Sequence, residues 1–362
     1  MANKSYRISP NYASHPGLTL QENIEYSGLL KKDIASKLGI TAKQLSRIIN
    51  GKASITPKVA LGLEKVLNLP YSFWMNLQNN YDKEQLIQNE EADLEKKKEL
   101  IKKYPYQELA QRGYVSGTED WLEKGRELLK FFHFASLGAL QKAVEADNHP
   151  ILDASFRVYT RTGQIDKYSL ASWVEIGKIE SEKLESEKFS KTKLRSMIPV
   201  IRKLTREKNF LGTLQEVLSQ CGVKLVLVHS LPKSQAAGVT YWADSETAVI
   251  QLGDRYNTID VFWFTLFHEI SHLILFTKHN ILDLDIYKDD KQEKQANQWA
   301  ADALIPDVDW KTFSEKNLFD ENDILSFAKE QAIDPAIVVG RLQKEKLIPY
   351  TLFHELKRNV SF

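Results

Sequence analysis

The chain has little of what exported or membrane proteins rely on. Its 362 residues include a single cysteine, Cys221, which cannot form an internal disulfide and fits a reducing compartment. No apolar run reaches the ~20 residues that a membrane-spanning helix needs, and no secretory signal is recognisable at the start. We therefore expect a cytoplasmic protein that has no membrane partner.

The sequence also lacks several signatures of chemistry. It has no glycine-rich phosphate-binding loop, no internal repeat, no low-complexity tail and no recognisable local Ser/His/Asp arrangement. Its 49 basic and 48 acidic residues nearly cancel, so any strongly charged surface must come from a local excess. The length is sufficient for two or three domains with substantial hydrophobic cores.

What the second half does contain is a metal-binding pattern. His268-Glu269-Ile270-Ser271-His272 has the H-E-x-x-H spacing, which on a helix places both histidines on one face, where they can reach a single Zn²⁺. Glu269 then points to the neighbouring side, where it can act as a general base. Apolar flanks predict that this helix is buried. The alternative is a core helix with two hydrogen-bonded histidines, although a glutamate between them suits a core poorly.

A third ligand is expected from the next helix along the chain. The longer pattern H-E-x-x-H-x-x-G-x-x-H is not met, because Leu275 and Lys278 stand where it needs glycine and histidine, and His279 is one residue off. In the next helix Glu293 and Asn297 lie one turn apart beside an apolar stripe, so Glu293 can bind zinc and Asn297 can support it. Three protein ligands leave one position for water, as in catalytic zinc sites. Glu293 could equally be a solvated residue of a charged first turn.

These motifs together resemble the ImmA/IrrE-type metallopeptidase domain, over roughly Phe210 to Val339. The resemblance rests on two halves in the right order, Phe264-Thr265-Leu266-Phe267-His268-Glu269-Ile270-Ser271-His272 and Glu293-x-x-Ala296-Asn297-x-Trp299-Ala300 with Leu304-Ile305-Pro306. Gln295 departs from the family, which often has a second acid there. The resemblance implies a zincin-like fold, dependence on zinc, and cleavage of a protein substrate, often a transcriptional regulator.

The N-terminal part has the layout of a helix-turn-helix at residues 31–52. An apolar face ends at Gly39, which permits the turn, and Thr41 caps a second helix that buries Leu45, Ile48 and Ile49. Outward side chains near the start of that helix can read base edges in the major groove, and two further residues suit phosphates. The predicted DNA-binding residues are Thr41, Lys43, Gln44, Ser46 and Arg47, with Asn50 and Lys52 at phosphates.

The charge distribution points to the same region. Residues 1–80 hold ten Lys/Arg and four Asp/Glu, an excess of six in a chain of net charge +1, so basic charge is concentrated where DNA contact is expected. The alternative is a protein-binding helical domain with a solvated basic face.

A second resemblance covers about residues 11 to 82, which are similar to HigA-type antitoxins of the Xre-like helix-turn-helix class. It rests on the helix-turn-helix together with His15-Pro16-Gly17, Ile55-Thr56-Pro57 and Ser72-Phe73-Trp74-Met75-Asn76-Leu77-Gln78. It implies a homodimer that binds a double-stranded operator. In such a dimer the aromatic and apolar side chains at the start of the last helix of this region would lie in the core or at the dimer surface. These residues are Tyr71, Phe73, Trp74 and Leu77.

We therefore predict a mainly α fold with a small β-sheet (α+β), in three parts. Residues 1–82 should form a five-helix helix-turn-helix domain, and residues 83–205 a helical linker region. Residues 206–362 should form a zincin-like metallopeptidase domain with C-terminal helices. The linker should begin with an exposed helix, and residues 323–344 should form one amphipathic helix. Strands are expected at 222–228, 238–242 and 248–252. The sheet edge beside the metal helix could then bind an extended peptide substrate.

Two functions from different classes compete on these grounds. In the first, the chain is a DNA-binding regulator of toxin–antitoxin or phage-related type whose zinc metalloendopeptidase cleaves a protein such as another regulator. In the second, it is an antitoxin or repressor whose zincin domain senses a signal or binds a partner without turnover. A further variant makes it the toxin or defence component of a toxin–antitoxin pair. Once zinc is bound, only an active peptidase needs Glu269.

Overall fold

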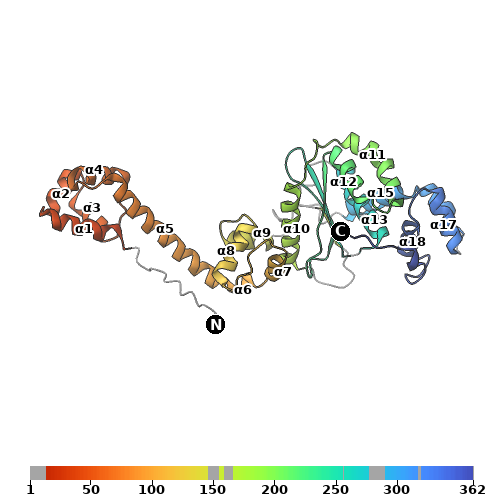
Figure 1. The fold of residues 1–362 in the computed structure, drawn as a ribbon, viewed down its shortest axis with the longest axis horizontal. Helices are drawn as coiled ribbons and strands as arrows, with labels where there is room; N and C mark the ends of the chain where they lie inside the picture. The colour runs from red at the N-terminus through yellow and green to blue at the C-terminus, as the bar shows by residue number, and fades with distance from the viewer. Residues whose placement is uncertain are drawn as a thin grey trace. The chain divides into compact units, whose positions relative to one another are not determined.

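The chain divides into two compact units, residues 1–97 and 98–362. The structure is a computed structural model that describes residues 14–145, 155–158 (as backbone), 166–255, 257–276, 290–316 and 319–361 (Figure 1). The division differs from the boundaries expected at 82 and 205. Residue 82 lies inside helix α5, which continues to Lys96 because nothing between them breaks a helix. The helices before 205 belong to the C-terminal unit.

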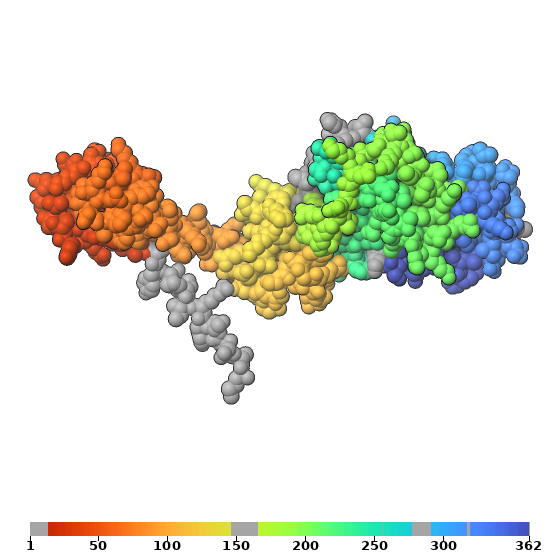
Figure 2. Space-filling model, turned by 45° about the horizontal axis from the view of Figure 1, so that its top comes forward, coloured from red at the N-terminus to blue at the C-terminus, as the bar shows by residue number. Residues whose placement is uncertain are grey.

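The first unit is a bundle of helices around one small core. In chain order its helices are α1 Pro16–Ser27, α2 Lys31–Leu38, α3 Ala42–Ile49, α4 Pro57–Leu67 and α5 Tyr71–Lys96. Gly39 ends α2 in the left-handed conformation, and Thr41 caps α3 by accepting a hydrogen bond from the Gln44 N–H. In the space-filling view the residues of α1 to α4 gather into one body coloured red to orange (Figure 2). The predicted five-helix helix-turn-helix domain is confirmed.

The His15-Pro16-Gly17 segment lets α1 pack directly on the end of α3. A Cβ at Gly17 would lie 2.2 Å from the carbonyl oxygen of Ile48, so a larger residue would force the two helices apart. Nδ1 of His15 accepts a hydrogen bond of 2.9 Å from the Gly17 N–H and so caps α1. Burial lowers the pKa of His15 against an opposing effect of Asp82, which favours the neutral imidazole that this bond requires.

The start of α5 belongs to the core of this unit. Trp74 is fully buried, and Gln78 accepts a buried hydrogen bond of 2.8 Å from the Ile55 N–H. Leu77 packs against the same core. Tyr71 and Phe73, in contrast, are more than one third exposed. The four apolar residues considered above therefore divide between core and surface.

The second unit surrounds a small sheet with helices. Its first half contains α6 Lys98–Ile101, α7 Tyr106–Gln111, α8 Trp121–Phe131, α9 Leu137–Glu145, β1 Ser155–Val158, α10 Lys167–Glu182, α11 Lys191–Lys203, the 3₁₀ turn η1 Leu204–Arg206 and α12 Leu211–Gln220. Its second half contains β2 Val223–Leu227, β3 Ala236–Trp242, β4 Ala248–Leu252, α13 Ile259–Leu275, α15 Asp290–Leu304, α16 Asp307–Ser314, α17 Glu321–Glu330, α18 Pro335–Lys344 and the 3₁₀ turn η3 His354–Leu356.

The described strands form a four-stranded sheet in the order β1-β3-β4-β2. β2 and β4 are parallel, whereas β3 is antiparallel to both β4 and β1. The three predicted strands are confirmed, and β1 is an addition that the sequence pattern did not indicate. Helix α10 lies on one face of the sheet, where the Gln251 amide donates to the Trp173 carbonyl (Figure 1). Helix α13 lies on the other face, against Gly238 of β3.

Helix α13 runs through the centre of the larger core. Four of its side chains are fully buried, those of Trp263, Leu266, Phe267 and Ile270. Side chains from α11, α12, the sheet and the C-terminal helices form the rest of this core. The segment after η3 fixes the start of α13, because Nζ of Lys357 lies 2.6 Å from Oδ2 of the buried Asp260.

The predicted helix at 323–344 is in fact two helices, α17 and α18. The break follows from Ala332, which has a positive φ of 53°, and from Pro335, which starts α18. The expectation of one continuous amphipathic helix is therefore wrong.

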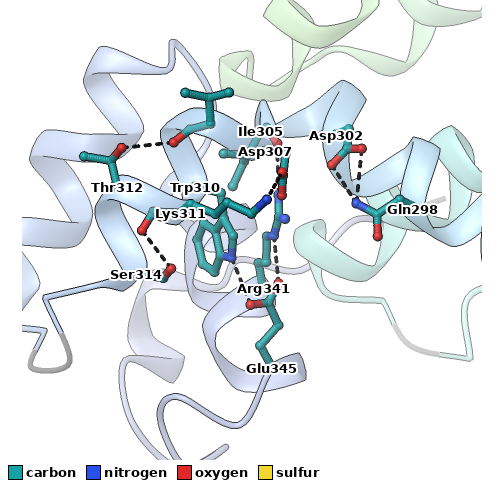
Figure 3. Close-up of polar contacts among 11 residues, drawn as sticks. Gln298, Asp302, Ile305, Asp307, Trp310, Lys311, Thr312, Ser314, Arg341 and Glu345 are labelled. Carbon is teal, nitrogen blue, oxygen red and sulfur yellow. Dashed lines mark hydrogen bonds and ion pairs between the residues drawn. The ribbon is translucent and has the colours of Figure 1, made fainter.

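Arginines hold the C-terminal end of α15 in place. Arg341 donates to the carbonyl oxygen of Ile305 at 2.9 Å, stacks on Trp310, and pairs with Glu345 at 3.0 Å (Figure 3). Arg202 donates to the Leu304 carbonyl at 2.8 Å. Helix ends leave carbonyl oxygens without partners, and cations are favourable there. Helix α15 is thereby tied to both α11 and α18.

Within the described residues, no helix is both long enough and apolar enough to cross a membrane.

Candidate functional site

The predicted metal ligands occupy the buried middle of α13. His268 and Glu269 are fully buried and His272 is 1% exposed. The helix is apolar on nearly every side because it lies between the sheet and α15, so these three polar side chains are surrounded by apolar residues. Charged or ligand-type groups are rarely placed in such surroundings without a partner or a function.

Helix α15 brings Glu293 to the two histidines. Its small residues Ala296 and Ala300 are fully buried, which allows close approach to α13, and the ring of Trp299 stacks on Phe267. Oε2 of Glu293 lies 3.3 Å from Nε2 of His268, and Oε1 lies 3.4 Å from Nε2 of His272. The two histidine Nε2 atoms are 3.1 Å apart. Ligand atoms from these three residues all lie within 4.8 Å of one another.

This arrangement fits a zinc ion. Two ligand atoms of tetrahedral zinc, each bound at ~2.0–2.1 Å, are separated by about 3.3 Å. The three contacts between Glu293, His268 and His272 are close to that length, and the donor set of two imidazoles and one carboxylate is one that catalytic zinc sites use. The side chain of Glu293 is 37% exposed, so the site opens toward solvent on that side. Lys278 and His279, considered above for the longer pattern, lie outside the described residues.

Glu269 points away from the ligands toward strand β3. Oγ1 of Thr240 lies 2.7 Å from Oε2 of Glu269, and a Cβ at Gly238 would lie 2.8 Å from Oε1. The carboxylate is therefore placed between the ligand face of α13 and the sheet. The two histidines thus face each other on one side of α13, and Glu269 lies on the neighbouring side; their roles as ligands and base stay predictions.

Strand β1 occupies the sheet edge that was expected to be open. It pairs with β3 antiparallel, with Ser155 opposite Thr240 and Arg157 opposite Gly238. Both partners on β3 are the residues that contact Glu269. The edge of the described sheet on this side is therefore β1 and not β3, and whether an extended peptide binds there stays a prediction.

The predicted DNA-binding residues form one exposed face on and after α3. All seven side chains are exposed, namely those of Thr41, Lys43, Gln44, Ser46, Arg47, Asn50 and Lys52. Leu45, Ile48 and Ile49 are buried on the opposite side, so the amphipathic assignment of α3 was correct. Two of these side chains form hydrogen bonds at the C-terminal end of α3. Arg47 donates to the Lys52 carbonyl at 3.3 Å, and the Asn50 amide donates to the carbonyl and the hydroxyl of Ser46.

Sequence reasoning missed the residues of β3 that complete the site. A threonine and a glycine in a short strand carry no recognisable signal, and they come next to Glu269 only because β3 packs on α13. Alternation along the strand could have placed Gly238 and Thr240 on one face, but not against Glu269. No signal in the sequence indicated strand β1 at Ser155–Val158, because four residues are too few for a periodic pattern.

Two family comparisons match the two motif regions. Residues 222–332 match the Peptidase_M78 family, described as the IrrE N-terminal-like domain, and residues 27–74 match the helix-turn-helix family. The first match contains α13 and α15 with His268, Glu269, His272 and Glu293. The second contains the whole of α2 and α3.

Curated proteins match a short part of the chain. Virulence-associated protein A' of Dichelobacter nodosus is 38% identical over 73 residues, which are 20% of this chain and 64% of that protein. An uncharacterized HTH-type transcriptional regulator of Escherichia coli (strain K12), YddM, is 33% identical over 69 residues, 18% of this chain and 73% of that protein. The chain thus spans just under two thirds of the length of the first of these relatives.

Solved structures of antidote proteins also match. An addiction module antidote protein of a HigA family from Coxiella burnetii is 32% identical, and the match covers 23% of this chain and 90% of that one with a TM-score of 0.21. A putative antidote protein of a plasmid maintenance system from Nostoc punctiforme is 28% identical over the same share of each chain, with a TM-score of 0.22.

Proposed function

Since the chain belongs to the helix-turn-helix regulators and carries an IrrE N-terminal-like domain of a peptidase family, we propose that it is a DNA-binding regulator with an active zinc metalloendopeptidase. The observation that carries the proposal is the convergence of His268, His272 and Glu293, with Glu269 beside them at the centre of a buried helix. The substrate class is a protein, such as another regulator, that offers an extended segment.

In this proposal His268, His272 and Glu293 hold one Zn²⁺. Bound zinc supplies a Lewis acid that polarises a peptide carbonyl and acidifies water. Glu269 accepts a proton from the attacking water at its carboxylate and passes it to the departing amine. The apolar surroundings of α13 exclude bulk water, which strengthens every charge interaction at the site. The contact between α15 and α13 keeps Glu293 within reach of the histidines.

In this proposal the N-terminal unit binds DNA and so brings the peptidase to an operator. The exposed polar face of α3 and the basic excess of residues 1–80 support recognition of a double-stranded operator. A homodimer would place two such helices on the half-sites of an inverted repeat. The exposed rings of Tyr71 and Phe73 at the start of α5 are available for that contact. We place the whole protein in toxin–antitoxin or phage-related regulation, in keeping with the resemblance of residues 11–82 to HigA-type antitoxins and with the regulator among its relatives.

A second function is favoured by one observation. Because β1 is paired along the edge of β3, the chain can be a repressor or antitoxin whose peptidase domain binds a partner or senses a signal and does not turn over. In that case zinc would stabilise the domain, and Glu269 would have no separate role. The two functions therefore differ in what a change of Glu269 alone does.

A comparison of cleaved proteins tests the proposal. Cells that express the full-length protein, and cells that express its Glu269→Gln variant at the same level, are analysed for new protein N-termini. The proposal predicts at least one cleavage that appears only with the unchanged protein. Identical sets of N-termini, with zinc bound in both proteins, would favour the repressor without turnover.

A further inference from the structure

Strand β3 presents two features to the carboxylate of Glu269, a hydroxyl group and a gap. The hydroxyl belongs to Thr240, which is fully buried, and its Oγ1 lies 2.7 Å from Oε2 of Glu269. The same oxygen is 3.3 Å from the backbone carbonyl of Glu269. A hydroxyl has one proton to donate, and the shorter contact with a charged acceptor is the stronger hydrogen bond.

The gap is at Gly238, two residues earlier and therefore on the same face of the strand. A Cβ at this position would lie 2.8 Å from Oε1 of Glu269 and 2.7 Å from Cγ2 of Thr265. These distances are too short for any side chain, so the absence of one makes room for the carboxylate. One oxygen of Glu269 is thus held by a hydroxyl, while the other lies in a space that only glycine leaves.

From this geometry we propose that Thr240 is a positioning residue for Glu269. Its hydrogen bond to Oε2 restricts rotation of the carboxylate and holds it beside the proposed metal ligands of α13. A general base must lie within ~2.6–3.2 Å of the proton that it takes, and a glutamate side chain with rotatable bonds does not hold such a position unaided. The inference rests on the proposed function, because it assigns a partner to the proposed base.

A small zinc-binding acid tests this role without knowledge of the protein substrate. Acetohydroxamic acid binds zinc through its two oxygens, and a neighbouring carboxylate accepts its remaining hydrogen bond. Its affinity therefore reports both the metal and the position of Glu269. The measurement uses the zinc-loaded full-length protein, with isothermal titration of acetohydroxamic acid and a parallel determination of bound zinc and of the thermal unfolding midpoint.

Three variants make the test specific. Thr240→Val removes the hydroxyl at nearly constant volume, and Thr240→Ser keeps it. Thr265→Val is the matched control, since this buried hydroxyl is also beside Gly238 but has no hydrogen-bond partner among the residues described. We expect Thr240→Val to weaken acetohydroxamate binding about tenfold with zinc content unchanged. Thr240→Ser and Thr265→Val should bind it like the unchanged protein.

Each other outcome contradicts a different claim. Unchanged affinity in Thr240→Val would overturn the positioning role while leaving the zinc site intact. Loss of zinc or a large fall in the unfolding midpoint in Thr240→Val, repeated in Thr240→Ser, would also overturn it, because Thr240 would then be a structural residue. A full-length protein that takes up no zinc would contradict the proposed function itself, and this inference with it.

Discussion

Nε2 of His268 lies 3.3 Å from Oε2 of Glu293, although the two residues belong to different helices. The contact exists because α15 packs on α13 through small residues and because arginines from α11 and α18 hold its far end. A buried histidine and a partly exposed glutamate could form a simple ion pair. The second histidine, His272, lies 3.4 Å from the same carboxylate, so the group has the arrangement that three donors to one metal ion would need.

The first prediction concerns metal binding. The purified full-length protein should hold one Zn²⁺ per chain, and Glu293→Ala should lower its affinity for zinc by at least about tenfold, because one of three protein ligands is removed. Bound zinc is measured after dialysis against a graded series of chelator concentrations. Asn297→Ala, one turn along α15, is the comparison and should have a much smaller effect. Full occupancy in Glu293→Ala would remove Glu293 from the ligand set.

The second prediction concerns DNA. The full-length protein should prefer an inverted-repeat operator over random DNA, with affinity that falls steeply as salt rises. Arg47→Ala and Gln44→Ala should each reduce that preference by about 1–3 kcal/mol, the typical discrimination that a side chain paired with a base edge provides. Lys52→Ala should weaken operator and random DNA about equally. Binding is measured by fluorescence anisotropy at several salt concentrations. An operator preference that survives both Arg47→Ala and Gln44→Ala would mean that α3 is not the recognition helix.

The third prediction concerns the pH dependence of the N-terminal unit. Burial lowers the pKa of His15, so the folded unit binds fewer protons than the unfolded chain. Its contribution to stability is present above the ordinary histidine pKa of ~6.5 and is lost as the pH falls through the lower, folded value. The protection of the α1 amides, relative to their intrinsic exchange rates at each pH, should therefore decrease as the pH falls below about 6.5.

A non-titrating cap provides the control for this prediction. His15→Asn keeps an acceptor for the Gly17 N–H, because asparagine is a favourable N-cap residue, but it cannot gain a proton. Its α1 should show a smaller change over the same pH range. Equal pH dependence in the two proteins would exclude His15 as the cause.

The fourth prediction concerns strand β1. A peptide that pairs with β3 must take the place of β1, so a covalent link between the two strands should block cleavage. Phe156 and Val239 are partners in the antiparallel register, and partners of this kind have Cα separations that a disulfide can span, so the link is made by Phe156→Cys combined with Val239→Cys. The oxidised double variant should be much less active than its reduced form. Equal activity in both forms, with the disulfide verified by mass, would mean that substrates do not enter along β3.

The sequence was most informative where spacing alone defines the chemistry. The H-E-x-x-H spacing and the apolar stripe of the next helix singled out His268, His272 and Glu293, which the structure brings together, because helical periodicity fixes which residues share a face. The same holds for α3, where Leu45, Ile48 and Ile49 mark the buried side. Contacts between distant segments could not be predicted in this way. Thr240 meets Glu269 only through the packing of a strand on a helix, and the boundary at Lys97 depends on which core each helix joins.

The central claim is that the domain is a working peptidase and not only a zinc-binding module. The most direct measurement compares the unchanged protein, Glu269→Gln and His268→Ala for zinc content and for cleavage of the same cellular protein. We predict that Glu269→Gln keeps its zinc and loses cleavage by ~10²–10⁴-fold, as expected for the loss of a positioned general base. His268→Ala should lose both zinc and cleavage. Cleavage by Glu269→Gln at the rate of the unchanged protein, with His268→Ala inactive, would contradict the account and leave zinc a structural or sensory role.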